Sequence, residues 1–131
     1  MKLPLAAIDF GAFGGTNFAK LELLRHNKDK FWELEPLSYV GHSADEMVDF
    51  VNTIASSGDV SCKEFIISGG IKSFLDGFYL MRKIKMPAIY GQASSLLKYA
   101  KESYDSLKGY LIYQVKGLAF SQAFLELKNE L

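Results

Sequence analysis

The segment EFIISGGIK, residues 64–72, decides the fold class of this chain. Its first five residues form a short apolar run, which is typical of a buried strand when turn residues bound it. A glycine pair ends the run, and Ser73 and Asp76 then open a helix whose apolar face uses Phe74, Phe78 and Met81. The segment therefore predicts a strand, a tight turn and a helix in that order.

The same order of elements recurs along the chain. Residues 5–10 are another apolar run, followed by a glycine-rich loop and by apolar positions at helical spacing from Asn17. Ser43 and Glu46 form a capping box, which predicts the start of a further helix. We expect strand-then-helix units near residues 3–26, 36–56, 63–84 and 87–108, with strands at 36–41 and 87–91, and a helical tail at 109–131 after a break near Gly109.

Strands that alternate with helices predict an α/β fold with parallel strands and right-handed crossovers. The chain has 131 residues, of which 49% are hydrophobic and 14% aromatic. This length and composition predict one folded domain, 1–131, and exclude a disordered tail.

Charge and cysteine content exclude several classes of function. Fifteen basic residues balance fifteen acidic ones, and no basic block stands out, so we expect no nucleic-acid partner and no membrane-surface partner. The single cysteine, Cys62, cannot form an internal disulfide or a zinc cluster. The start of the sequence lacks the features of a signal peptide, which predicts a cytoplasmic protein.

Ligands of parallel α/β folds bind at the carboxyl ends of the strands. There, glycines let backbone amides approach an anion, and the following helix directs its positive end at the same place. One candidate phosphate cradle follows the strand at 64–68, and a weaker one follows the strand at 87–91. The candidate residues are Gly69, Gly70, Ile71, Lys72, Ala93 and Ser94. A tight turn with a solvated lysine would give the same pattern.

The loop 11–17 follows the first strand and is long enough to close over a ligand. Thr16 is a candidate ligand contact, although it also suits the N-cap of the next helix. Asp9 precedes the loop, and we interpret it as an acceptor for loop amides. No metal-ligand spacing and no nucleophile–base pair is present, so we predict no catalytic and no metal residue.

Two segments resemble a known family. Residues 6–22, AAIDFGAFGGTNFAKLE, are similar to a signature of the type 2, flavin-dependent isopentenyl-diphosphate isomerases. Residues 67–72, ISGGIK, with Leu75 and Asp76 after them, resemble a second segment of the same family. The two segments occur in the family's order, and the resemblance extends to about Leu97.

The resemblance implies that the four units are the carboxyl-terminal half of a TIM (β/α)8 barrel that binds flavin mononucleotide (FMN). Thr16 would contact the flavin, while Gly11 stands where the family often has a serine. The turns after the last two strands would bind the FMN phosphate through Gly69, Gly70, Ile71, Lys72, Ala93 and Ser94.

The family isomerises isopentenyl diphosphate to dimethylallyl diphosphate in isoprenoid biosynthesis, and it also uses NADPH and magnesium. Its amino-terminal half carries the substrate and magnesium residues, and no such stretch exists here. We therefore expect part of a flavin site and no isomerase activity from this chain alone.

Two alternatives remain open. The chain could be a non-catalytic half-barrel that binds flavin or phosphate, or that self-associates, because unpaired sheet edges favour a homo-oligomer. It could also be a doubly wound, flavodoxin-like domain, which would need helices on both faces of the sheet.

Overall fold

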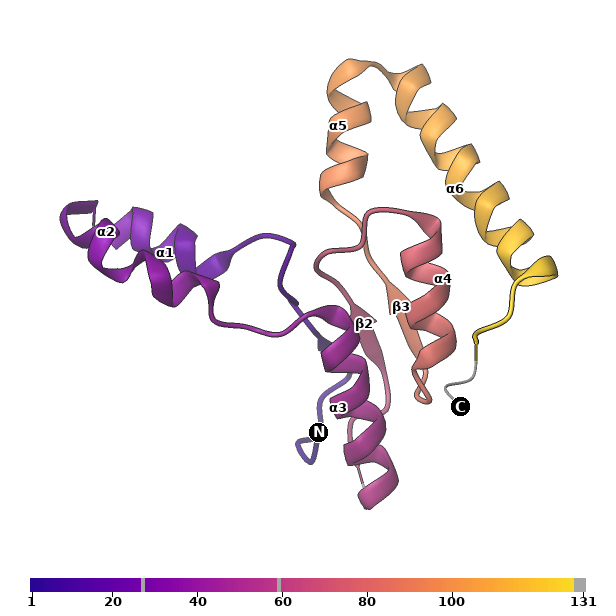
Figure 1. Cartoon of the computed structure of the whole chain (residues 1–131), viewed down its shortest axis with the longest axis horizontal. Helices are drawn as coiled ribbons and strands as arrows, with labels where there is room; N and C mark the ends of the chain where they lie inside the picture. Colours follow the sequence, from indigo (N-terminus) through magenta and orange to yellow (C-terminus); the bar gives the residue numbers. More distant parts are fainter. Residues whose placement is uncertain (27, 59, 129–131) are drawn as a thin grey trace.

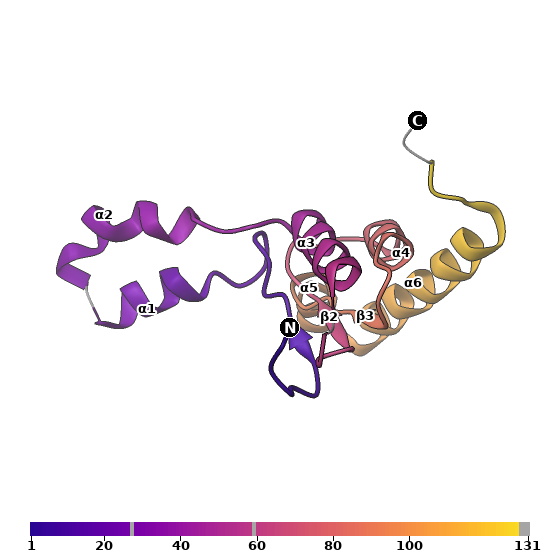
Figure 2. The ribbon, with the colours of Figure 1, turned by 90° about the horizontal axis from the view of Figure 1, so that it is seen from below.

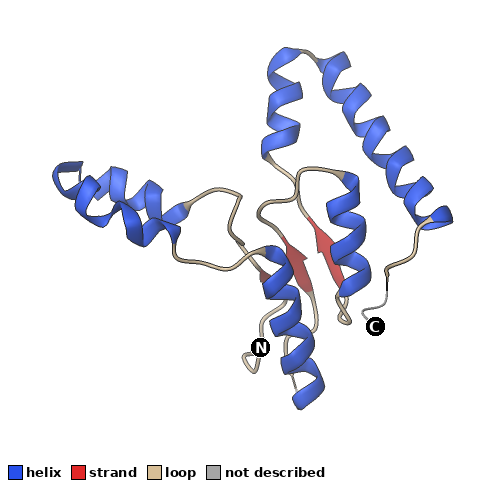
Figure 3. Ribbon diagram, in the orientation of Figure 1, coloured by secondary structure: helices blue, strands red, loops and turns tan. Residues whose placement is uncertain are grey.

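The computed structural model describes residues 1–26, 28–58 and 60–128. It shows a mixed α/β fold with six α-helices and one parallel sheet (Figure 3). The elements in chain order are β1 (Ile8–Asp9), α1 (Phe18–His26), η1 (Lys28–Lys30), α2 (Phe31–Leu34), η2 (Glu35–Tyr39), α3 (Ala44–Ser57), β2 (Phe65–Ile67), α4 (Phe74–Lys83), β3 (Ala88–Tyr90), α5 (Ser94–Glu102) and α6 (Tyr104–Phe124), where η marks a 3-10 helix.

The strand order in the sheet is β1-β2-β3, which follows the order of the chain. The central strand β2 aligns Ile66 with Asp9 on one side and with Ile89 on the other. Helices α3 and α4 lie over the same face of this sheet, as two perpendicular views show (Figures 1 and 2). The three strands show no reversal of order, and the doubly wound alternative requires such a reversal at its switch point.

The core lies between the sheet and helices α3 and α4. Phe65 and Ile67 point to this side of β2 and are at most 1% exposed, whereas Ile66 points to the other face. Val48 of α3 is fully buried, and Leu80 of α4 packs into the same cluster. Alternation along β2 therefore places Ile66 on a second face of the sheet, for which the described residues supply no helical layer, and Ile89 of β3 is 64% exposed there.

The predicted strand at 36–41 is wrong. Residues 35–39 form the 3-10 helix η2, with Pro36 in its first turn. Local side-chain bonds replace a sheet ladder here, because the Ser38 hydroxyl donates to the Glu35 carbonyl and the Asn17 amide donates to the Ser38 carbonyl, each at 2.6 Å. The sheet therefore has three strands where four were expected.

Residues 18–26 and 28–39 form a helical arm, which comprises α1, η1, α2 and η2 and projects away from the sheet (Figures 1 and 2). An ion pair of 2.8 Å between Lys20 and Glu35 joins its first and last helices. Phe18 and Leu21 lie on the apolar face that the helical spacing after Asn17 predicts, and they are 66% and 44% exposed. The rest of the chain therefore leaves much of that face uncovered.

The carboxyl-terminal helices divide at Ser103, not near Gly109. Ser103 ends α5, and its hydroxyl accepts a hydrogen bond from the amide of Ser106 at the start of α6. The predicted helical tail ends at Phe124; residues 125–128 are not helical, and 129–131 lie outside the described residues. None of the helices in the described residues is both long and apolar enough to span a membrane.

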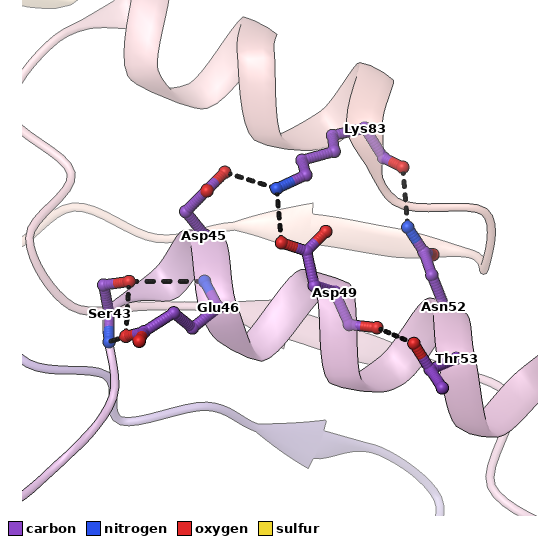
Figure 4. A network of polar contacts seen from close by, with 7 residues as sticks. All are labelled: Ser43, Asp45, Glu46, Asp49, Asn52, Thr53 and Lys83. Carbon is purple, nitrogen blue, oxygen red and sulfur yellow. Dashed lines mark hydrogen bonds and ion pairs between the residues drawn. The ribbon is translucent and has the colours of Figure 1, made fainter. Parts of the chain in front are cut away.

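Helices α3 and α4 are joined by polar contacts that centre on Lys83 (Figure 4). The Lys83 ammonium lies 2.8 Å from a carboxylate oxygen of both Asp45 and Asp49, and the Lys83 carbonyl accepts a hydrogen bond from Asn52. Burial opposes the charged form of Lys83, but the two carboxylates outweigh it and raise its pKa above the ordinary value. Ser43 and Glu46 form the predicted capping box at the start of α3.

Candidate functional site

A cavity of about 680 Å³ lies at the carboxyl ends of all three strands. Its lining comes from the loop after β1, the turn after β2 and the segment between β3 and α5. The structure brings six of the seven candidate residues into this lining: Thr16, Gly69, Gly70, Ile71, Ala93 and Ser94. Segments that are distant in sequence therefore meet at one place, as the strand-end rule predicts for parallel sheets.

Lys72, the seventh candidate, is exposed and is not part of this lining. Its amide donates to the Asp76 carboxylate at 3.0 Å, and its carbonyl lies 3.4 Å from the Ser95 hydroxyl. Lys72 therefore joins the turn to helix α5 through its backbone, and its positive charge is not placed among the lining groups.

The glycines of the two loops are needed for packing between the loops. Gly69 has φ +94°, and a Cβ at this position would lie 2.0 Å from the carbonyl oxygen of Ala12. A Cβ on Gly14, which has φ +96°, would lie 2.9 Å from the Cα of Gly70. Only glycine permits both the left-handed backbone and this approach of one main chain to another.

Asp9 accepts from a loop amide, as predicted. Its Oδ1 accepts a hydrogen bond of 2.9 Å from the amide of Gly11, and the Ser68 hydroxyl donates to the same oxygen. The amide of Ala12 also donates to the Ser68 carbonyl, at 3.0 Å. Asp9 thus fixes the loop after β1 against the end of β2, and it lies in the cavity lining as well.

Of the two helices that the sequence places after the candidate cradles, α4 has a capped N-terminus and α5 has no side-chain cap. The Asp76 carboxylate accepts hydrogen bonds from the amides of Lys72 and Ser73, so a negative charge already stands at the start of α4. Helix α5 begins at Ser94 after Ala93, which has no side chain to cap it. Both of these residues line the cavity, so the first-turn amides of α5, which have no side-chain cap among the described residues, lie at its wall.

Thr16 is not the N-cap of α1. The Oδ1 of Asn17 accepts from the amide of Lys20 at 2.9 Å, so Asn17 has the capping role. Thr16 remains an exposed side chain at the cavity.

Two polar residues of the lining, Ser68 and Gln92, were not among the site candidates. Ser68 directly follows β2 and Gln92 lies two positions after β3, so the strand-end rule places both residues at this edge of the sheet. The Gln92 Oε1 lies 3.5 Å from the Tyr110 hydroxyl, and its buried Nε2 has no partner among the described residues.

The cavity contains little charge. Asp9 is the one ionisable side chain in its lining, and no group of three or more metal-ligating side chains occurs within residues 1–26, 28–58 and 60–128. The remaining lining offers hydroxyls, one amide side chain and backbone groups. Such a set can bind an anion through N–H and O–H donors, and it can accept a donor of the ligand at Asp9.

The fold and the cavity define the class of this protein: a parallel α/β domain with a polar, glycine-rich cavity at the strand ends. No family model, no curated protein and no solved structure matches the chain.

Proposed function

We propose that the chain binds the phosphate end of flavin mononucleotide in this cavity, as the carboxyl-terminal half of a barrel similar to the type 2 isopentenyl-diphosphate isomerases. One observation carries the proposal: residues from three separate strand ends line a single cavity, and the uncapped start of α5 lies at its wall. A phosphate binds to the backbone amides at the start of a helix, where the helix dipole places a partial positive charge.

The volume of the cavity suits a ligand larger than phosphate. At about 680 Å³ it lies within the range of small-molecule and cofactor sites, which is roughly 300–1,000 Å³. Ile66 and Phe18 add apolar surface beside the polar strand ends. A phosphate ester with an organic body fits this combination better than inorganic phosphate does.

The test is a fluorescence titration of FMN and of riboflavin, which lacks the phosphate. We expect FMN to bind at least 10-fold more tightly, because only FMN reaches the amides of α5 with an anion. Ser94→Glu should remove this preference, since its carboxylate takes the place of the phosphate while it suits the start of a helix. Ser94→Gln is the neutral control and should keep the preference. Equal affinities of the wild type for both flavins, or no binding of either, would contradict the proposal.

A second candidate function is self-association, and the open face of the sheet favours it. Ile89 is 64% exposed there, and the aligned Ile66 extends the apolar surface toward β1. We propose that this face pairs with that of another copy, which would cover the sheet on its second side. Sedimentation should show a homo-oligomer that Ile89→Glu dissociates, whereas a wild-type chain that stays monomeric at high concentration would exclude this function.

A further inference from the structure

One side chain of the cavity has no role in holding a phosphate, and that is Asp9. A carboxylate repels an anion, yet Asp9 is the sole ionisable group that the described residues contribute to the lining. Its Oδ1 is held by the Gly11 amide and by the Ser68 hydroxyl. Its Oδ2 accepts no hydrogen bond from the described residues, and the side chain is exposed at the cavity.

Two contacts to one oxygen fix the orientation of the whole carboxylate. The loop contacts need a single acceptor, and a carboxylate has acceptor capacity for more than these two donors. The second oxygen is therefore an oriented acceptor on a residue of the cavity lining. Such an oxygen binds a hydroxyl or an N–H of a ligand and disfavours a second anionic group.

The position of Asp9 defines the length of a ligand that reaches it. Asp9 aligns with Ile66, and Ile66 aligns with Ile89 on the third strand, so two strand spacings of about 4.8 Å separate Asp9 from β3. Helix α5 starts just after β3. A molecule that contacts both the start of α5 and Asp9 must therefore extend roughly 10 Å across the strand ends.

We infer that Asp9 is a ligand-binding residue which selects a phosphate ester whose body carries hydrogen-bond donors about 10 Å from the phosphate, as a sugar alcohol or an N–H-bearing heterocycle does. This inference rests on the proposed function, because it assumes that the phosphate lies at α5. It adds the chemical class of the organic part of the ligand that the cavity accepts. It also assigns a second role to Asp9, which orders the loop after β1.

The experiment compares FMN with inorganic phosphate in the wild type and in Asp9→Asn. Asparagine keeps an acceptor for the Gly11 amide and the Ser68 hydroxyl, but it replaces the second oxygen with a donor. Direct titration gives the affinity for FMN, and displacement of FMN gives the affinity for phosphate. We expect Asp9→Asn to weaken FMN about 10-fold, which is the loss of one hydrogen bond to a charged group, and to leave phosphate affinity unchanged.

A matched variant separates binding from loop order. Ser68→Ala removes one donor to Asp9 but leaves its carboxylate, so it should change FMN affinity less than Asp9→Asn does. Equal weakening of FMN and phosphate in Asp9→Asn would mean that Asp9 acts only through the loop, and this would overturn the inference. No change in either affinity would overturn it too. A wild type that binds neither FMN nor phosphate would instead refute the proposed function itself.

Discussion

Substitution of Gly69 by alanine tests whether the two glycine loops pack as the structure shows. The new Cβ would lie 2.0 Å from the Ala12 carbonyl oxygen, more than an ångström inside an ordinary van der Waals contact. Relief of this overlap separates the loops and breaks the bond between the Ala12 amide and the Ser68 carbonyl, which costs about 1 kcal/mol. The left-handed backbone of Gly69, with φ +94°, adds about 1–2 kcal/mol for a residue with a Cβ. We expect the free energy of unfolding to fall by roughly 2–3 kcal/mol.

Two other glycines of the same cavity provide the controls. Gly11 has φ +51° but open space around its Cβ position, so Gly11→Ala should cost only the backbone term of about 1–2 kcal/mol. Gly91 has neither a positive φ nor a neighbour within 4 Å, so Gly91→Ala should have almost no effect. Urea denaturation followed by circular dichroism measures the series, and Gly69→Ala should lower the midpoint by about 1 M or more at unchanged slope. If Gly69→Ala costs no more than Gly91→Ala, the loops do not pack against each other and the cavity is not formed in this way.

Three further predictions concern the helices. Lys83→Met removes the cation between α3 and α4 and should lower the free energy of unfolding by about 1 kcal/mol, because the carboxylates it contacts are half exposed. A loss above about 3 kcal/mol in urea denaturation would contradict this estimate of the ion pairs' contribution. Burial raises the pKa of Asp45, but hydrogen bonding to Lys83 outweighs it and holds the pKa below the ordinary 3.8. The stabilisation by this ion pair should therefore be present above about pH 4 and be lost as the pH falls below it. Acid denaturation of the wild type and of Lys83→Met would measure this difference. In α6, Gly109→Ala meets no neighbour and should stabilise by about 0.5–1 kcal/mol, whereas a Cβ on Gly117 would lie 2.4 Å from the Phe74 ring and should destabilise, so opposite shifts in thermal unfolding are expected.

Local signals were sufficient to predict much of the fold. The apolar runs at 64–68 and 87–91 contain β2 and β3, and the pair Ser43–Glu46 starts α3 where it was expected. Each of these signals depends on residues within a few positions of one another. The strand predicted at 36–41 is wrong because the apolar residues there resemble those of a strand. In the structure, the carbonyls of Glu35 and Ser38 accept hydrogen bonds from the side chains of Ser38 and Asn17 in a 3-10 helix.

The candidate site was predicted less completely, for a similar reason. Position after a strand was enough to select Gly69, Gly70 and Ser94, because the ends of parallel strands meet at one edge. The groups that a charged side chain contacts were not predictable in this way. Asp76 turns its carboxylate back onto the amide of Lys72, and this contact was not inferred from the sequence.

Because the two loops pack against each other, only some residues of the cavity are evidence for a ligand. Gly14, Gly69 and Gly70 are explained by contacts within the protein, so they would be required even if the cavity bound nothing. The start of α5 has no such explanation. Among the described α-helices of nine residues or more, the others begin with an asparagine or serine side chain that accepts from a backbone amide, and a missing cap costs about 1 kcal/mol. An anion at Ala93 and Ser94 would supply the missing acceptor, and Asp9 lines the same cavity, with no partner for its second oxygen among the described residues. The ligand hypothesis therefore rests on α5 and Asp9, and the glycines determine only whether the cavity exists.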